Sequence, residues 1–155
     1  YGFLLVCKMP ELEYLNDRET IVLKRLESDQ NCIYSGEKIP SGEFGVGFNF
    51  TGYESRTPWV RIESVVDFSD AVTEAYKTDG SSVDGTTGII IGRSNSDLEC
   101  DICGETITEF EYFTIEDSDP RYSMRIHKNE GCIDQFQKDL KNLKSKMYLV
   151  LPEKI

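Results

Sequence analysis

The chain lacks any apolar run approaching the roughly 20 residues that a helix needs to cross a bilayer. It also lacks a basic segment ahead of its first apolar stretch, YGFLLVC, which a secretory signal would require. These two absences predict a soluble protein without a membrane partner. We expect its location to be cytoplasmic.

Positive charge is scarce, since 17 lysines and arginines face 28 aspartates and glutamates and leave a formal net charge of −11. A polyanion repels nucleic acid, which argues against extensive wrapping of DNA or RNA by the whole chain. Residues 121–146 are the exception, with a local balance of +4 that leaves −15 on the rest. This segment predicts either a solvated helix face or a phosphate-binding surface. The candidate contacts are Arg121, Arg125, Lys128, Lys138, Lys141, Lys144 and Lys146.

The composition is that of a folding chain, because 39% of the 155 residues are hydrophobic and 11% are aromatic. The stretch YGFLLVCKM predicts a strand that Pro10 ends. In NDRETIVLKRLESD, helical spacing of Ile21, Val22, Leu23 and Leu26 predicts a short helix that Asn16 or Asp17 caps. Residues 78–97 are rich in Gly, Ser and Asp and predict a linker with one short strand at GIIIG. No Gly-Lys-Ser/Thr follows these glycines, which excludes a phosphate-binding loop.

Histidine occurs once, and it joins three of the five cysteines between residues 100 and 132. The pairs are Cys100-x2-Cys103 and His127-x4-Cys132, and zinc favours four tetrahedral ligands from thiolate sulfur and imidazole nitrogen. Disulfides and independent core cysteines are the alternatives; an intracellular setting disfavours the first, and independent burial leaves the pairing with the one histidine unexplained. We therefore predict one Zn²⁺ per chain. Cys7 and Cys32 are expected to be buried thiols.

The segment after Cys103 alternates as a hairpin strand does, with Ile107, Phe110, Tyr112 and Ile115 as packing residues. The apolar residues that follow Cys132 recur at 3.6-residue spacing and place it at the start of a helix; they are Ile133, Phe136, Leu140 and Leu143. This order of turn, hairpin and ligand-bearing helix, from Cys100 to Lys144, resembles a treble-clef zinc finger. It is loosely similar to the poly(ADP-ribose) polymerase-type and LIM-type fingers.

Residues 31–43 and 99–111 resemble each other, with Cys32 over Cys100 and Gly36 over Gly104. A second block matches Arg61-Ile62 with Arg125-Ile126, which would put Ser35, Glu63 and Phe68 at the positions of Cys103, His127 and Cys132. This predicts a degenerate, metal-free copy, and chance resemblance is the alternative. We expect an α+β protein of β-hairpins and short helices. Its predicted regions are an N-terminal strand and helix (1–30), a metal-free half (31–77), a linker (78–97) and a zinc-binding half with a C-terminal helix (98–155).

Four protein ligands leave no position for a reacting water, so we expect a structural metal and a protein that is not an enzyme. Glu116, Asp117 and Asp119 stand beside Pro120 and predict a solvated turn rather than an acid/base pair. No small-molecule substrate is evident. One hypothesis is a protein-interaction adaptor, with Tyr53, Trp59 and Tyr122 as candidate contacts, although Trp59 also suits the core. The other is a binder of nucleic acid or a ribonucleoprotein through the basic segment.

Overall fold

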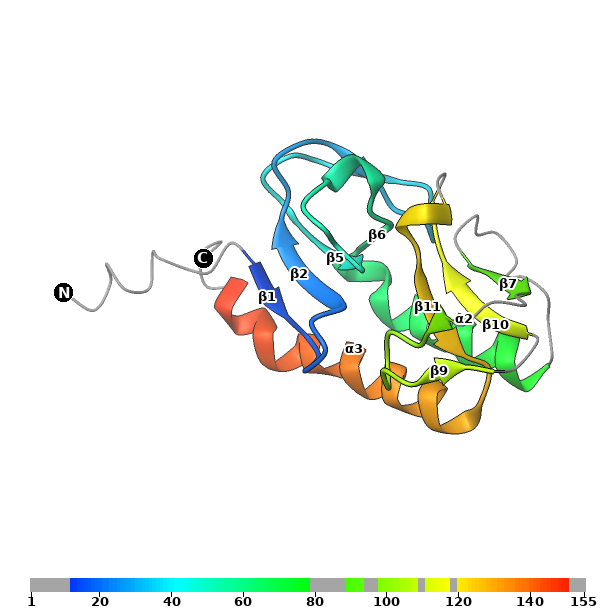
Figure 1. Ribbon diagram of the computed structural model, residues 1–155. Helices are drawn as coiled ribbons and strands as arrows, with labels where there is room; N and C mark the ends of the chain where they lie inside the picture. Colours follow the sequence, from blue (N-terminus) through cyan, green and yellow to red (C-terminus); the bar gives the residue numbers. More distant parts are fainter. Residues whose placement is uncertain (1–11, 79–88, 94–97, 109–110, 118–119, 151–155) are drawn as a thin grey trace.

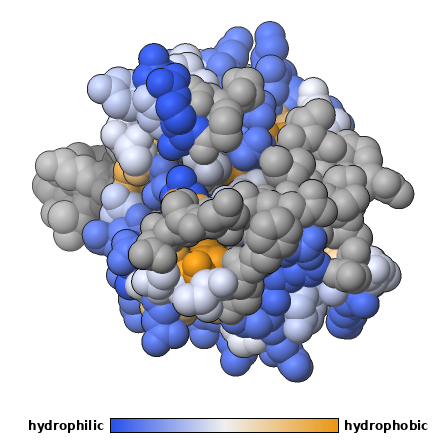
Figure 2. Space-filling view, turned by 45° about the vertical axis from the view of Figure 1, so that its right-hand side comes forward, coloured by the Kyte–Doolittle hydropathy of each residue, from blue (hydrophilic) through white to orange (hydrophobic). Residues whose placement is uncertain are grey.

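The computed structural model describes residues 12–78, 89–93, 98–108, 111–117 and 120–150. It has the expected α+β character, with small antiparallel sheets and two helices (Figure 1). In the described part of the chain, no helix combines the length and the apolar character that crossing a membrane requires. On the face shown in Figure 2, the described surface is mostly hydrophilic and hydrophobic residues show only in small areas.

The first half contains a four-stranded antiparallel sheet in the order β1-β2-β5-β6, a separate two-stranded sheet and one helix. Its elements are β1 (Leu12–Tyr14), β2 (Ile21–Arg25), β3 (Gln30–Asn31), β4 (Lys38–Ile39), β5 (Phe44–Phe48), the 3-10 turn η1 (Glu54–Arg56), β6 (Trp59–Arg61), the 3-10 turn η2 (Ile62–Ser64) and α2 (Val65–Lys77). The strands β3 and β4 pair antiparallel and form the two-stranded sheet.

The second half contains a three-stranded sheet in the order β11-β10-β7, another two-stranded sheet and the longer helix. Its elements are β7 (Ile89–Arg93), β8 (Leu98–Glu99), β9 (Thr106–Ile107), β10 (Glu111–Ile115), the 3-10 turn η3 (Pro120–Tyr122), β11 (Met124–His127) and α3 (Glu130–Val150). The short strand expected at GIIIG is β7, and the rest of that linker up to residue 97 lies outside the described residues, apart from Thr78. The series β2, β3–β4, β5, η1, β6 and α2 of the first half thus matches the series β7, β8–β9, β10, η3, β11 and α3 of the second half, with β1 and η2 in addition in the first half.

The helix predicted within residues 16–29 is wrong, because this segment carries the strand β2. Ile21, Val22 and Leu23 are all buried, as in a central strand that is covered on both faces. The Asn16 side chain caps no helix; its Oδ1 accepts the backbone N–H groups of Thr20 at 3.0 Å and Ile21 at 3.1 Å. A run of neighbouring apolar residues suits either structure, and here pairing with β5 decides for the strand. The strand predicted before Pro10 lies outside the described residues.

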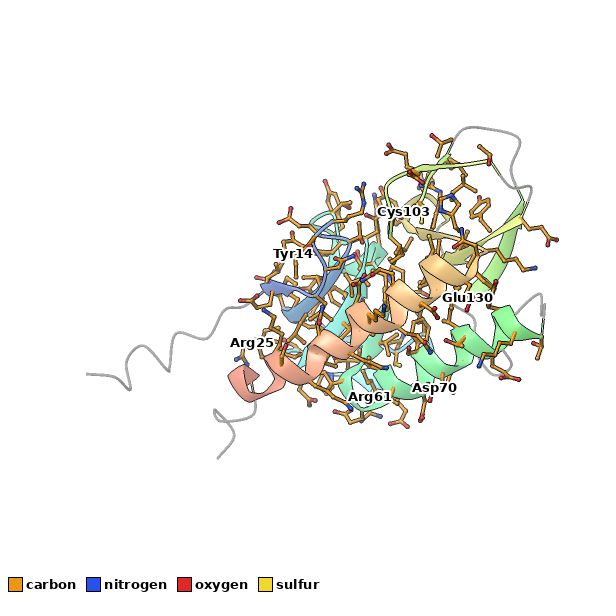
Figure 3. All side chains as sticks on the ribbon, turned by 90° about the horizontal axis from the view of Figure 1, so that it is seen from below. Tyr14, Arg25, Arg61, Asp70, Cys103 and Glu130 are labelled. Carbon is orange, nitrogen blue, oxygen red and sulfur yellow. The ribbon has the colours of Figure 1, made fainter. Side chains whose placement is uncertain are left out.

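One hydrophobic core joins the two halves. The helices α2 and α3 pack against each other, and Figure 3 shows them side by side on the underside of the molecule. Phe48 of β5 lies 5.4 Å from Phe68 of α2 and 6.0 Å from Phe136 of α3, measured between ring centroids. The predicted apolar face of α3 is confirmed, since its residues are buried; they are Ile133, Phe136, Leu140 and Leu143. The second half therefore docks on the first through helix packing rather than through a shared sheet.

Candidate metal centre

The predicted ligands converge on one point. One ligand atom from each of Cys100, Cys103, His127 and Cys132 lies within 4.8 Å of every other. The sulfur of Cys103 is 3.3 Å from His127 Nδ1, the sulfur of Cys132 is 3.5 Å from the same atom, and the sulfurs of Cys100 and Cys132 are 3.9 Å apart. Figure 3 shows Cys103 beside the first turns of α3. The cluster can hold a metal ion.

The turn between β8 and β9 positions the first two cysteines. The backbone N–H of Gly104 donates to the Cys100 carbonyl at 2.8 Å, and the N–H of Cys100 donates to the Glu105 carbonyl at 2.9 Å. Gly104 has φ +81°, a left-handed conformation that strains residues with a side chain. A Cβ there would also collide with the Arg18 guanidinium. The backbone conformation therefore favours glycine after Cys103, whereas the Arg18 guanidinium is the end of an exposed, flexible side chain that can move aside.

The other two ligands come from the end of β11 and the start of α3. The Asn129 side chain accepts the backbone N–H of Cys132 at 2.8 Å, which caps the helix and holds this cysteine in the first turn. His127 Nε2 lies 3.3 Å from the Thr106 carbonyl. With a proton on Nε2, this contact orients the ring and leaves the lone pair of Nδ1 facing the sulfurs.

The electrostatics of the cluster favour a cation at its centre. Cys100, His127 and Cys132 are buried, and only Cys103 is exposed. Burial raises the pKa of the Cys100 and Cys132 thiols, and the neighbouring Cys100 sulfur raises the pKa of Cys132 further. Two donated N–H groups at 3.4 Å, from Ile102 and His127, compensate this only in part at Cys100. Bound metal would replace the thiol protons and supply the missing positive charge.

A cavity of about 700 Å³ lies beside the cluster, and Cys103, His127 and Cys132 form part of its wall. A second cavity of about 390 Å³ shares four residues with it and follows α3; they are Asn16, Asp17, Gln135 and Asp139. Asp139 is buried, and its carboxylate accepts Gln135 Nε2 at 2.8 Å. Sequence reasoning counted this residue only toward local charge, although its spacing of seven residues, about two turns, from Cys132 places both on the same side of a helix.

The first half builds the same turn around Cys32. Its N–H donates to the Glu37 carbonyl at 2.8 Å, its carbonyl accepts the N–H of Gly36 at 2.9 Å, and Gly36 has φ +75°. Burial raises the pKa of the Cys32 thiol, but N–H groups donated by Ser35 at 3.3 Å and Arg61 at 3.4 Å leave the pKa lowered overall. The burial predicted for this thiol is confirmed. Among the described residues, no metal-sized cluster includes Cys32.

The predicted equivalence of Glu63 with His127 is wrong. The backbone N–H that reaches Cys32 belongs to Arg61, whereas the N–H that reaches Cys100 belongs to His127. In the same way, the Trp59 carbonyl accepts from the residue after Cys32, and the Arg125 carbonyl accepts from the residue after Cys100. In the structure Arg61 therefore corresponds to His127, which differs by two residues from the match based on letters.

The predicted binding residues fall in different places. The structure divides the seven basic residues between the η3–β11 region and α3. Lys128 pairs with Glu111 at 3.2 Å and Lys146 pairs with Glu13 at 3.5 Å, whereas the basic side chains of α3 that stay exposed are Lys138, Lys141 and Lys144. Among the candidate aromatics, Trp59 is in the core, Tyr122 is half-buried and Tyr53 is exposed. Asp117 is exposed after β10, and Asp119 lies outside the described residues.

No protein-family model, curated protein or solved structure matches the chain. Function is therefore inferred from the chemistry of the site itself.

Proposed function

We propose that this chain is a zinc-stabilised, non-enzymatic module that binds another protein. The carrying observation is that the Cys100, Cys103, His127 and Cys132 ligand atoms all lie within 4.8 Å of one another. In this proposal the four residues hold one structural Zn²⁺ in a treble-clef-like finger. The function then lies on surfaces that the metal keeps in place.

The distances within the cluster support zinc. Bonds of about 2.3 Å to sulfur and about 2.0–2.1 Å to nitrogen in a tetrahedral site separate two sulfurs by about 3.8 Å, and a sulfur from a nitrogen by about 3.6 Å. The Cys100–Cys132 sulfur distance is 3.9 Å, and the two sulfur–Nδ1 distances to His127 are 3.3 and 3.5 Å. A donor set of three sulfurs and one imidazole nitrogen also suits zinc rather than a hard cation.

A structural role follows from the number of ligands. A catalytic zinc keeps one position for water or substrate, whereas three cysteines and one histidine complete a tetrahedron. The single histidine of the chain is part of this set and is not available as a base elsewhere. A closed site stabilises the fold without taking part in a reaction.

Residues 31–77 are, in this proposal, a metal-free copy of the metal-binding unit. The shared turn around Cys32 and Cys100 supports this, as does the common order of elements. Aromatic packing of Phe48 and Phe68 against Phe136 contributes in this half what zinc contributes in the other.

A protein partner is favoured over nucleic acid by the net charge of −11. Binding of nucleic acid or a ribonucleoprotein is the second candidate, because Lys138, Lys141 and Lys144 are exposed at spacings of three residues on one face of α3. Such a stripe could contact successive phosphates.

Metal content tests the central claim. Purified protein is expected to carry about one zinc per chain, as a closed Cys₃His site would. Cys132→Ser should lose most of this metal, because serine replaces one of the four ligands, whereas Cys32→Ser should retain it. Elemental analysis after exhaustive dialysis measures both. A folded, zinc-free wild-type protein would contradict the proposal.

Partner capture separates the two candidate functions. Cross-linking in the native host, followed by mass spectrometry and nucleic-acid sequencing, should recover a protein that remains bound after nuclease treatment. Binding that instead needs RNA or DNA, falls steeply with salt and is lost in the Lys138→Ala/Lys141→Ala/Lys144→Ala variant would favour the second candidate.

A further inference from the structure

Two short turns, one from each half, bring arginine and tyrosine side chains together on the surface. In Figure 1 the teal turn η1 and the yellow turn η3 lie close to each other on the upper side of the molecule. Arg56 Nη1 donates to the Tyr122 hydroxyl at 2.6 Å and so joins the turns. We call the set Tyr53, Arg56, Arg121 and Tyr122 the arginine–tyrosine stack.

The arginines of the stack lie at cation–π distances from its tyrosines. The Cζ atom of Arg56 is 5.5 Å from the centroid of the Tyr53 ring and 5.1 Å from that of Tyr122. Arg121 Cζ is 5.7 Å from the Tyr122 centroid. These are cation–π distances, so the guanidinium of Arg56 lies close to both tyrosine rings. Its other N–H groups remain available to a ligand.

Arg56 has no carboxylate partner within the described residues, although the chain holds 28 aspartates and glutamates. The nearest acidic residue in sequence, Glu54, is engaged elsewhere. Its carboxylate pairs with Lys24 at 2.6 Å and accepts the backbone N–H of Glu27 at 3.0 Å. An exposed guanidinium that lies beside aromatic rings and has no carboxylate partner among the described residues is suited to bind an anion.

Hydrogen bonds also hold the turn that carries the stack. The indole N–H of the buried Trp59 donates to the Glu54 carbonyl at 2.9 Å, and the Thr57 hydroxyl donates to the Tyr53 carbonyl at 2.8 Å. Tyr53 is 59% exposed, more than any other aromatic side chain that the structure describes. A fixed turn with an exposed aromatic side chain loses little entropy on binding, which is the condition for an interface hot spot.

Resting on the proposed function, we propose that the arginine–tyrosine stack is the docking site for an acidic segment of the partner protein. A carboxylate of that segment would accept two N–H groups from Arg56, because the planar guanidinium matches a carboxylate in bidentate geometry. An apolar neighbour of the carboxylate would pack on the open face of Tyr53. Tyrosine and arginine are the residue types enriched at interface centres.

A protein segment fits better than nucleic acid. Binding to a phosphate backbone uses several cations in a row, whereas the ligand here would meet chiefly Arg56, which has no carboxylate partner among the described residues, on a chain of net charge −11. One carboxylate needs only that one arginine.

The test uses the full, zinc-loaded chain and a panel of labelled, end-capped acidic peptides that each carry one leucine or phenylalanine beside their carboxylates. Matched peptides carry asparagine and glutamine in place of aspartate and glutamate. Fluorescence anisotropy measures affinity, and amide NMR shifts of residues 53–57 and 122 locate the site. Uridine and thymidine decamers serve as nucleic-acid probes.

At least one acidic peptide should bind and its amide-matched form should not. Arg56→Ala should weaken binding at least about tenfold, and Arg56→Lys should weaken it nearly as much because lysine lacks the planar fork. Lys141→Ala removes an exposed charge from α3 and should leave affinity unchanged. Because Arg56 is exposed, its variants should keep the wild-type melting temperature, which separates lost binding from lost folding.

Three results would overturn the docking site. No peptide changes the amide NMR shifts of residues 53–57 and 122, Arg56→Ala binds the peptide as tightly as wild type does, or the decamers bind there more tightly than the peptides. The outcome is separable from that of the proposed function. A cross-linked protein partner that Arg56→Ala retains refutes this site alone, whereas recovery of nucleic acid without a protein partner refutes the proposed function.

Discussion

At Asp139 a carboxyl group lies on the buried side of α3 with amides for neighbours instead of a cation. The side chains of Gln135 and Asn16 donate to it, and the nearby Asp17 repels its charge. Burial is the largest effect and raises the pKa above its ordinary value of 3.8, with the charge of Asp17 adding to it. Arg18 shares the wall of the adjoining cavity.

The sign of this shift predicts a stability gain for Asp139→Asn. Above pH 3.8 the unfolded chain releases the Asp139 proton, whereas the folded chain keeps it up to the raised pKa. The free energy of unfolding of the wild type therefore falls as the pH rises from 3.8 to the raised pKa. Asparagine removes the penalty, because the Gln135 amide can turn to accept from it. Thermal melts near pH 7 should show a gain on the order of 1 kcal/mol that disappears by about pH 3. Asp134→Asn, exposed on the same helix, should show no such dependence, and a gain that is equal at both pH values would contradict the reasoning.

At the scale of the element, the two glycines of β5 differ in how much space their surroundings leave for a side chain. Gly47 pairs with Trp59 of β6 in the sheet, and a Cβ on Gly47 would come within 2.5 Å of the Trp59 ring. A Cβ on Gly45 would meet the same ring at 3.4 Å. Because Trp59 is only 1% exposed, its ring has no room to retreat.

Gly47→Ala is therefore expected to destabilise the protein by about 1–3 kcal/mol, the usual range for overpacking a core. Gly45→Ala should cost clearly less, since 3.4 Å needs only a small adjustment. Urea denaturation of both variants measures the difference. Equal destabilisation would mean that strand conformation, not the Trp59 contact, explains these glycines.

At the scale of the whole molecule, the first half and the second half, which carries the cysteine–histidine cluster, share one core. Phe136 of α3 contacts Phe48 and Phe68 of the first half, with ring centroids 6.0 and 6.3 Å apart. Hydrogen bonds between the halves add to this packing; for example, Thr20 Oγ1 donates to the Asp101 carbonyl at 2.8 Å. Neither half can lose its packing without exposing the other.

Metal removal should consequently unfold both halves in one transition. Structural zinc contributes on the order of 10 kcal/mol in isolated fingers, which is comparable to the whole stability of a typical domain. Trp59, the only tryptophan, is buried in the first half and reports on that half by fluorescence. A chelator should shift this emission together with the loss of helix signal in circular dichroism, and added zinc should reverse both. Native Trp59 emission after complete zinc release would show that the halves fold independently.

Sequence alone determined the features that depend on local spacing and on side-chain chemistry. The four ligands, the helix after Cys132 and its apolar face could all be predicted, because two close ligand pairs and a 3.6-residue period are visible without knowing the fold. The burial of Cys32 and Trp59 followed from their apolar character.

Only the tertiary structure decided the features that depend on which segments meet. Ile21–Leu23 suits helix or strand until β5 pairs with it, and the counterpart of His127 became visible as Arg61 only through the hydrogen bond to Cys32. Arg56 and Tyr122 are 66 residues apart in sequence, and no local pattern predicts that one stacks on the other. A set of metal ligands can be recognised from the spacing of residues in the sequence, whereas a binding surface arises when distant segments pack together.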